Sequence, residues 1–115
     1  MNETLQFLVM VDGECSREEI TDRLVEEFPE AIRLKENSCD LRENWIEVWY
    51  NEDYDRISAQ DDEDGYLYFR YRVEVTPLGE RVKEVDQIDL AKAIVAAIRK
   101  KGLTAVICAN FENRL

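Results

Sequence analysis

The chain has 115 residues, of which 45% are hydrophobic and 36% are charged, and its formal net charge at pH 7 is -11. This length fits one domain with a core of its own, and the spread of apolar residues argues against a disordered acidic tail. We expect residues 1–115 to form a single domain. The chain contains no histidine, which excludes a Cys-His nucleophile and any His-containing metal motif.

The compartment is predicted from the apolar runs and the cysteines. No apolar run approaches the roughly 18 residues that span a bilayer, and residues 1–10 contain Glu3 and no basic region. The three cysteines are odd in number and widely spaced, unlike a disulfide framework or a zinc site. We therefore expect a cytoplasmic protein without membrane contact. Cys108 is expected in the core, and Cys15 and Cys39 in loops or at the edges of elements.

The first third of the chain predicts a strand followed by a helix. Residues 5–11 form a nearly continuous apolar run, typical of a central strand. Ser16 and Glu19 form a capping-box pattern that begins a helix, and Pro29 is expected to end it. Residues 30–43 are open between a short strand and the packed exit from the helix.

Residues 45–50 and 66–75 alternate between polar and apolar positions, so we expect two strands that form a hairpin. Which face of the 45–50 strand packs on the core is left open. In the second strand, one face is expected to pack and the other to meet water. The packed face would be Leu67, Phe69, Tyr71, Val73 and Val75, and the other face Tyr66, Tyr68, Arg70, Arg72 and Glu74.

The last third predicts a helix that begins near Asp86 and ends at residues 100–102, followed by a strand over residues 103–111. The element order is then strand, helix, strand, strand, helix, strand. This order is typical of the α+β ferredoxin-like split βαβ fold (βαββαβ). We expect a four- to five-stranded antiparallel sheet with two helices on one face.

The segment 51–64 concentrates negative charge, with seven carboxylates against the single cation Arg56. Dense carboxylates attract a cationic partner and speed its encounter. Our leading hypothesis is a non-enzymatic binding protein that docks a basic protein, by analogy of charge and size with immunity-type inhibitors of nuclease toxins. A loop that only aids solubility is an equal alternative. The expected protein-binding residues are Glu52, Asp53, Tyr54, Asp55, Asp61, Asp62, Glu63, Asp64 and Tyr66.

Catalytic and metal sites are not expected. The acidic spacing does not match the calcium-binding loop, so a solvated hairpin loop is preferred over a metal site. The chain lacks a phosphate-binding glycine loop and a nucleophile elbow. We therefore expect no enzyme activity and no cofactor.

The open face of the sheet offers a second hypothesis, a small-ligand or regulatory module. Aromatic and arginine side chains on such a face can hold a carboxylate ligand. Nucleic acid is not expected there, because the net charge repels phosphates. A third hypothesis is self-association, so the protein is expected to be a monomer or a homodimer. The ligand-binding residues of the second hypothesis are Trp45, Trp49, Tyr68, Arg70 and Arg72.

Overall fold

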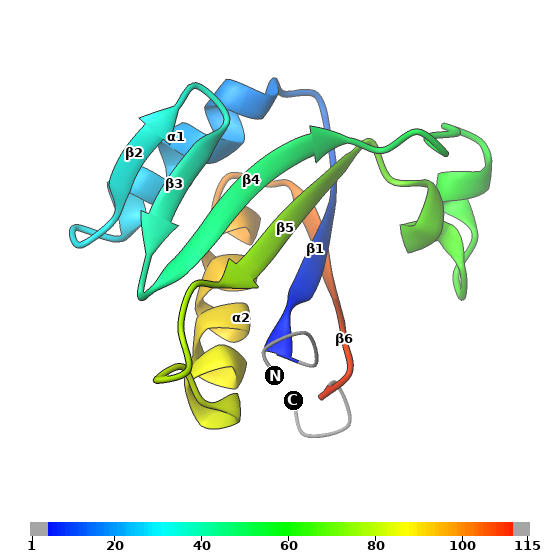
Figure 1. Cartoon of the computed structure of the whole chain (residues 1–115). Coiled ribbons are helices and arrows are strands. Elements are labelled where there is room, and N and C mark those ends of the chain that lie inside the picture. Colours follow the sequence, from blue (N-terminus) through cyan, green and yellow to red (C-terminus); the bar gives the residue numbers. More distant parts are fainter. Residues whose placement is uncertain (1–4, 112–115) are drawn as a thin grey trace.

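The computed structural model describes residues 5–111, which contain six strands and two α-helices (Figure 1). Within this range no helix is long and apolar enough to cross a membrane. The elements are β1 (Phe7–Asp12), α1 (Arg17–Glu27), β2 (Ile32–Lys35), β3 (Ser38–Leu41), β4 (Asn44–Tyr50), β5 (Tyr71–Pro77), α2 (Glu84–Arg99) and β6 (Thr104–Ala109).

The strands form one sheet in the order β2-β3-β4-β5-β1-β6, and every neighbouring pair is antiparallel. The expected α+β class is confirmed, but the expected strand count of four to five is wrong. The additional strands are β2 and β3, which form a hairpin within residues 30–43, where the sequence was compatible with a short strand or with the packed exit from the helix. The sequence of β2, Ile-Arg-Leu-Lys, does alternate, but over only four residues, all of them exposed, which is too short a pattern to separate a strand from the packed exit of a helix.

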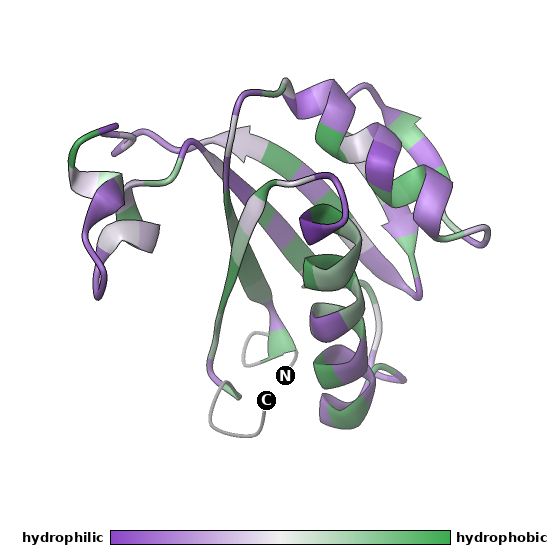
Figure 2. Ribbon diagram, turned by 180° about the vertical axis from the view of Figure 1, so that it is seen from behind, coloured by the Kyte–Doolittle hydropathy of each residue, from purple (hydrophilic) through white to green (hydrophobic). Residues whose placement is uncertain are grey.

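Both helices cover the same face of the sheet, α1 over β3 and β4 and α2 over β1 and β6 (Figures 1 and 2). The core lies between these two layers. Ile46 and Val48 of β4 are fully buried there, so Trp45, Glu47 and Trp49 lie on the open face. Each fully buried aliphatic side chain contributes about 1.5–3 kcal/mol. Other core residues with no exposed surface include Val9, Val11, Leu24, Val73, Val75, Leu90, Ile94 and Ile98.

The predicted start of α1 is confirmed, whereas that of α2 is displaced. Ser16 Oγ accepts a hydrogen bond from Glu19 N at 3.1 Å, and the Glu19 carboxylate accepts one from Ser16 N at 2.9 Å. Helix α2 begins at Glu84, two residues before the expected position. Its Asp86 lies in the first turn and accepts a hydrogen bond from Lys83 N at 3.1 Å. Asp86 is thus the third residue of the helix, and its carboxylate reaches back to the backbone of Lys83, the residue that precedes the helix.

The expected strand 66–75 is too long, because β5 begins at Tyr71 and residues 65–68 form the short 3-10 helix η3 (Gly65–Tyr68). From Tyr71 onward the predicted alternation of buried and partly exposed residues is confirmed. Two cysteine predictions are also corrected. Cys39 is fully buried in β3, while Cys108 is only partly buried, because it lies opposite Leu8 on the open face of the sheet.

Candidate protein-binding surface

Residues 51–70 join β4 to β5 and extend away from the sheet (Figure 1). We call this segment the projecting connection. It contains two 3-10 helices, η2 (Ser58–Gln60) and η3, rather than the simple hairpin loop expected. Its base is closed by Asn51, which is buried and whose side-chain amide donates to the carbonyl oxygens of Leu67 and Phe69 at 2.9 and 2.8 Å. These hydrogen bonds turn the chain away from the strand that the sequence predicted.

Two of the acidic side chains shape the projecting connection. Asp55 Oδ1 accepts hydrogen bonds from the backbone N–H groups of residues 57 and 58, at 2.9 and 3.2 Å. Asp61 Oδ1 likewise accepts from Glu63 N at 2.8 Å and Asp64 N at 2.9 Å. The N–H groups of Asp64 and Glu63 lower the pKa of Asp61, because they stabilise its ionised form. Both carboxylates thus hold local turns of the projecting connection.

The charge of the projecting connection is not balanced by cations of the described chain. The six ion pairs of residues 5–111 involve none of its seven carboxylates. Arg70, at the end of the projecting connection, has its guanidinium 5.0 Å from the ring centroid of Tyr54 and donates to the Tyr54 hydroxyl at 2.9 Å. The acidic residues predicted as a site are therefore together on one segment, exposed to solvent and available to an outside cation.

The projecting connection also exposes large apolar side chains. Ile57 is 81% exposed, Leu67 47% and Tyr54 36%. Sequence reasoning missed Ile57 and placed Leu67 in the core. An isolated isoleucine in a polar segment without helical or strand periodicity is a signal that could have identified Ile57. Tyr66, predicted in the same site, is partly buried and lines the hollow described next.

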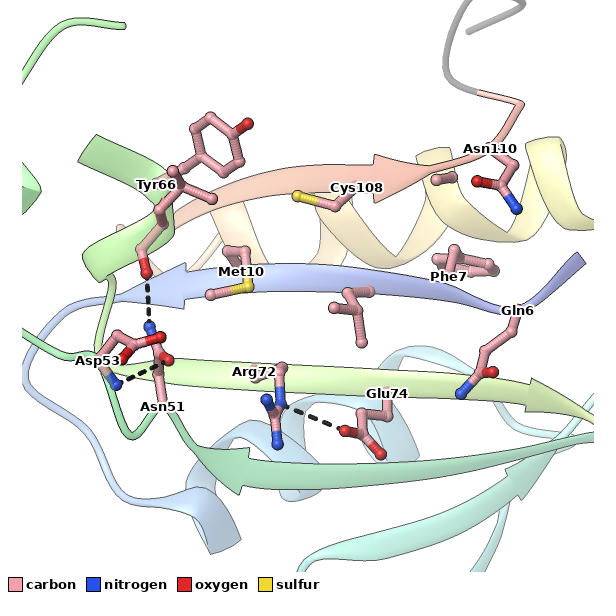
Figure 3. Close-up of a pocket in the computed structure, with 13 residues that line it drawn as sticks. Gln6, Phe7, Met10, Asn51, Asp53, Tyr66, Arg72, Glu74, Cys108 and Asn110 are labelled. Carbon is pink, nitrogen blue, oxygen red and sulfur yellow. Dashed lines mark hydrogen bonds and ion pairs between the residues drawn. The ribbon is translucent and has the colours of Figure 1, made fainter. Parts of the chain in front are cut away.

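A hollow of about 750 Å³ lies on the open face, between the projecting connection and strands β1, β5 and β6 (Figure 3). Leu8 and Met10 of β1 contribute apolar surface. Beside them, Arg72 Nε lies 3.2 Å from Glu74 Oε2, an ion-pair distance without hydrogen-bond geometry. The hollow is thus part apolar and part charged.

The structure pairs two of the five predicted ligand-binding residues, Trp49 of β4 and Arg72 of β5, directly across the open face, but it does not gather the whole set in one hollow. Of the five, only Arg72 lines the hollow. Trp45 and Trp49 lie on β4, where Trp45 Nε1 donates to Glu47 Oε1 at 3.1 Å. Tyr68 belongs to η3, and Arg70 stacks on Tyr54.

Comparisons with known proteins give no assignment. A search of protein-family models finds no matching family, and searches of curated proteins and of solved structures find no significant match. Within residues 5–111, no group of three or more Cys, Asp or Glu side chains is arranged to hold a metal ion. The function of the protein is therefore inferred from the geometry and charge of the projecting connection.

Proposed function

We propose that this protein is a non-enzymatic acidic binding protein whose projecting connection docks a basic surface of another protein. The observation that carries the proposal is the set of seven carboxylates that form no ion pair with any cation of residues 5–111, on a segment held by its own hydrogen bonds. A preorganised acidic surface raises the rate of encounter with a cationic partner and loses little conformational entropy on binding.

Apolar contacts at the same surface would supply most of the binding energy. Binding energy concentrates in a few side chains that become fully buried, while charges at the rim set rate and specificity. Ile57, Leu67 and Tyr54 are exposed among the carboxylates, so a basic protein with an apolar depression fits this surface. An inhibitor of the immunity type, which masks the cationic groove of a nuclease toxin in the cytoplasm, is the kind of protein we propose.

We also propose that the fold is the ferredoxin-like split βαβ arrangement with a hairpin added at one edge. The support is the strand order β4-β5-β1-β6 within the sheet, with α1 after β1 and α2 between β5 and β6. In that arrangement, the β2–β3 hairpin extends the sheet beyond β4. The projecting connection then takes the place of the central hairpin loop.

The test removes the negative charges of residues 61–64, which we call the acidic tip, without changing the shape of their side chains. The variant carries Asp61→Asn, Asp62→Asn, Glu63→Gln and Asp64→Asn. An asparagine at position 61 retains the oxygen that accepts from residues 63 and 64. The partner is first isolated with the wild-type protein, and its association rate is then measured by surface plasmon resonance. At low salt we expect the rate to fall about tenfold in the variant and its salt dependence to flatten.

The matched control removes the same charge elsewhere. Glu14, Glu26, Glu80 and Asp89 are exposed or partly exposed and lie outside the projecting connection. Their replacement by Gln or Asn should leave the association rate within about twofold, since steering depends on where the charge lies. An equal loss in both variants would reduce the proposal to a net-charge effect. Capture of the partner at wild-type rate by the tip variant would refute it.

The hollow on the open face supports a second candidate function, the binding of a small amphipathic anion. Its apolar side and the guanidinium of Arg72 match an apolar body and a carboxylate. The substitution Arg72→Gln separates the two functions, because it should abolish ligand binding in the hollow and leave partner association unchanged. Ligand-induced shifts of the methyl resonances of Leu8 and Met10 would report occupation of the hollow.

A further inference from the structure

The two edges of the sheet differ in their protection against pairing with another strand. At the β2 edge, the strand is four residues long, carries Arg33 and Lys35, and has an irregular register between them. The Arg33 guanidinium also donates to the carbonyl oxygens of Lys35 and Glu36 at 3.2 and 2.7 Å. Charges, short length and irregular register are the features that block strand addition at an edge.

The β6 edge lacks these features. Its sequence Thr-Ala-Val-Ile-Cys-Ala contains no charge and no proline, and its pairing with β1 continues in one register from residue 104 to 109. Within residues 5–111 no strand lies on its other side. Arg99 covers one backbone group by donating to Ala105 O at 2.8 Å. A regular, uncharged edge is the geometry to which an extended segment adds as a further strand.

A groove accompanies this edge. Lys92, Val95, Ala96 and Arg99 of α2 are spaced at i, i+3, i+4 and i+7, so they form one stripe along the helix. Together with the β6 segment 106–107 they line a cavity of about 370 Å³. The groove thus combines apolar side chains with two cations on a molecule of net charge -11.

We propose that the β6 edge and this groove bind an extended acidic segment of another protein, which adds as a seventh strand. Apolar side chains on one face of that segment would contact Val95, Ala96 and Ile107. Its carboxylates would pair with Lys92 and Arg99. A second copy of this chain is a poorer occupant, because symmetric β6 pairing would bring the same cations of both copies together. This proposal is independent of the projecting connection.

The test uses full-length protein and the synthetic heptapeptide Thr-Glu-Thr-Val-Thr-Glu-Thr, in which the central valine and both glutamates lie on the same face of an extended strand. Binding is followed by amide resonances in NMR titrations. We expect the resonances of residues 104–109 to shift and to become protected from hydrogen exchange. A peptide with lysine in place of glutamate should bind about tenfold more weakly at low salt. A glutamate peptide with N-methyl groups on alternate residues should not bind, since it cannot form the ladder.

The variant Lys92→Glu should weaken the glutamate peptide about tenfold. Lys35→Glu, which changes the same charge on the opposite edge, should leave its affinity within about twofold. Unshifted β6 amides at millimolar peptide would overturn the proposal, and so would equal affinities of the glutamate and lysine peptides. Sedimentation that shows a dimer formed through β6 would also overturn it, in favour of a second copy as the occupant.

Discussion

Asn44 of β4 and Gln87 of α2 form a reciprocal pair of side-chain hydrogen bonds. Asn44 Nδ2 donates to Gln87 Oε1 at 3.1 Å, and Gln87 Nε2 donates to Asn44 Oδ1 at 2.9 Å. Both residues are fully buried. Gln87 Nε2 also donates to Leu5 O at 3.0 Å. One polar contact therefore joins a helix, a central strand and the segment before β1, and it fixes where α2 lies on the sheet.

Gln87→Leu should destabilise the fold by about 1–3 kcal/mol, because the buried side-chain oxygen of Asn44 would lose the donor that Gln87 supplies. Urea denaturation followed by circular dichroism would measure the change. The double variant Asn44→Leu, Gln87→Leu should lose less than the sum of the single variants, since no side-chain amide is then left unpaired. Strict additivity of the two single losses would show that the pair is not coupled.

Gly65→Ala should loosen the projecting connection. A Cβ atom at this position would lie 2.5 Å from the backbone oxygen of Ala59, so η2 and η3 would have to separate. We expect faster hydrogen exchange of the amides of residues 57–67 and a loss of up to about 3 kcal/mol in stability.

Gly79→Ala is the matched control, because a Cβ atom there meets no atom within 4 Å. It should leave the exchange rates of residues 57–67 unchanged. If Gly65→Ala also left them unchanged, the connection would be flexible enough to absorb the methyl group. Its role as a preorganised docking surface would then fail.

The elements with strong local patterns were predictable from the sequence, and those set by tertiary contacts were not. The capping box of Ser16 and Glu19 and the alternation from Tyr71 to Val75 are local and were predicted. Residues 66–69 also alternate, but the buried Asn51 amide binds their carbonyl groups and removes them from the strand. No short-range pattern indicates that a distant side chain will take these bonds.

The same distinction applies to the β3–β4 hairpin and to the candidate site. The turn between β3 and β4 uses Arg42 and Glu43 at positive φ, 51° and 62°, without the Asn-Gly pair by which such turns are recognised. The sequence located the acidic residues of the site because charge is visible in composition. Two features depend on the folded arrangement: the acidic residues form no ion pair within the described part of the chain, and Ile57 is exposed beside them.

Glu43→Gly should stabilise the protein by up to about 1 kcal/mol. Glu43 has a φ of 62°. This left-handed conformation is strained for any residue with a Cβ atom, whereas glycine adopts it without that strain. The substitution removes an ion pair with Arg81 at 2.7 Å, but Arg81 is 85% exposed and such a pair contributes little. The midpoint of urea denaturation would measure the gain. Arg81→Gln, which removes only the ion pair, should lower the urea midpoint slightly. A decrease larger than about 1 kcal/mol in stability would mean that the ion pair outweighs the backbone strain, and Glu43→Gly would then destabilise the protein.

The contact between Glu27 of α1 and Lys100 after α2 should depend on pH. Glu27 Oε1 accepts a hydrogen bond from Lys100 Nζ at 2.7 Å, and this bond, with the charges of Lys100 and Arg23, lowers the pKa of Glu27 below its ordinary value. A carboxyl whose pKa is lower in the folded state stabilises the fold above its unfolded pKa of about 4.3. That stabilisation is lost as the pH falls through the lower pKa that Glu27 has in the folded state.

Lys100→Met should therefore raise the pKa of Glu27 in an NMR titration of its side-chain carboxyl carbon. The stability difference between wild type and variant should be present at pH 7 and disappear at a pH below the folded pKa of Glu27, because protonated Glu27 no longer pairs with Lys100. Lys101→Met is the matched control, since Lys101 is an exposed neighbour outside the Glu27 contact, and it should leave the Glu27 titration unchanged. An unshifted Glu27 pKa in Lys100→Met would mean that the two residues do not interact in solution.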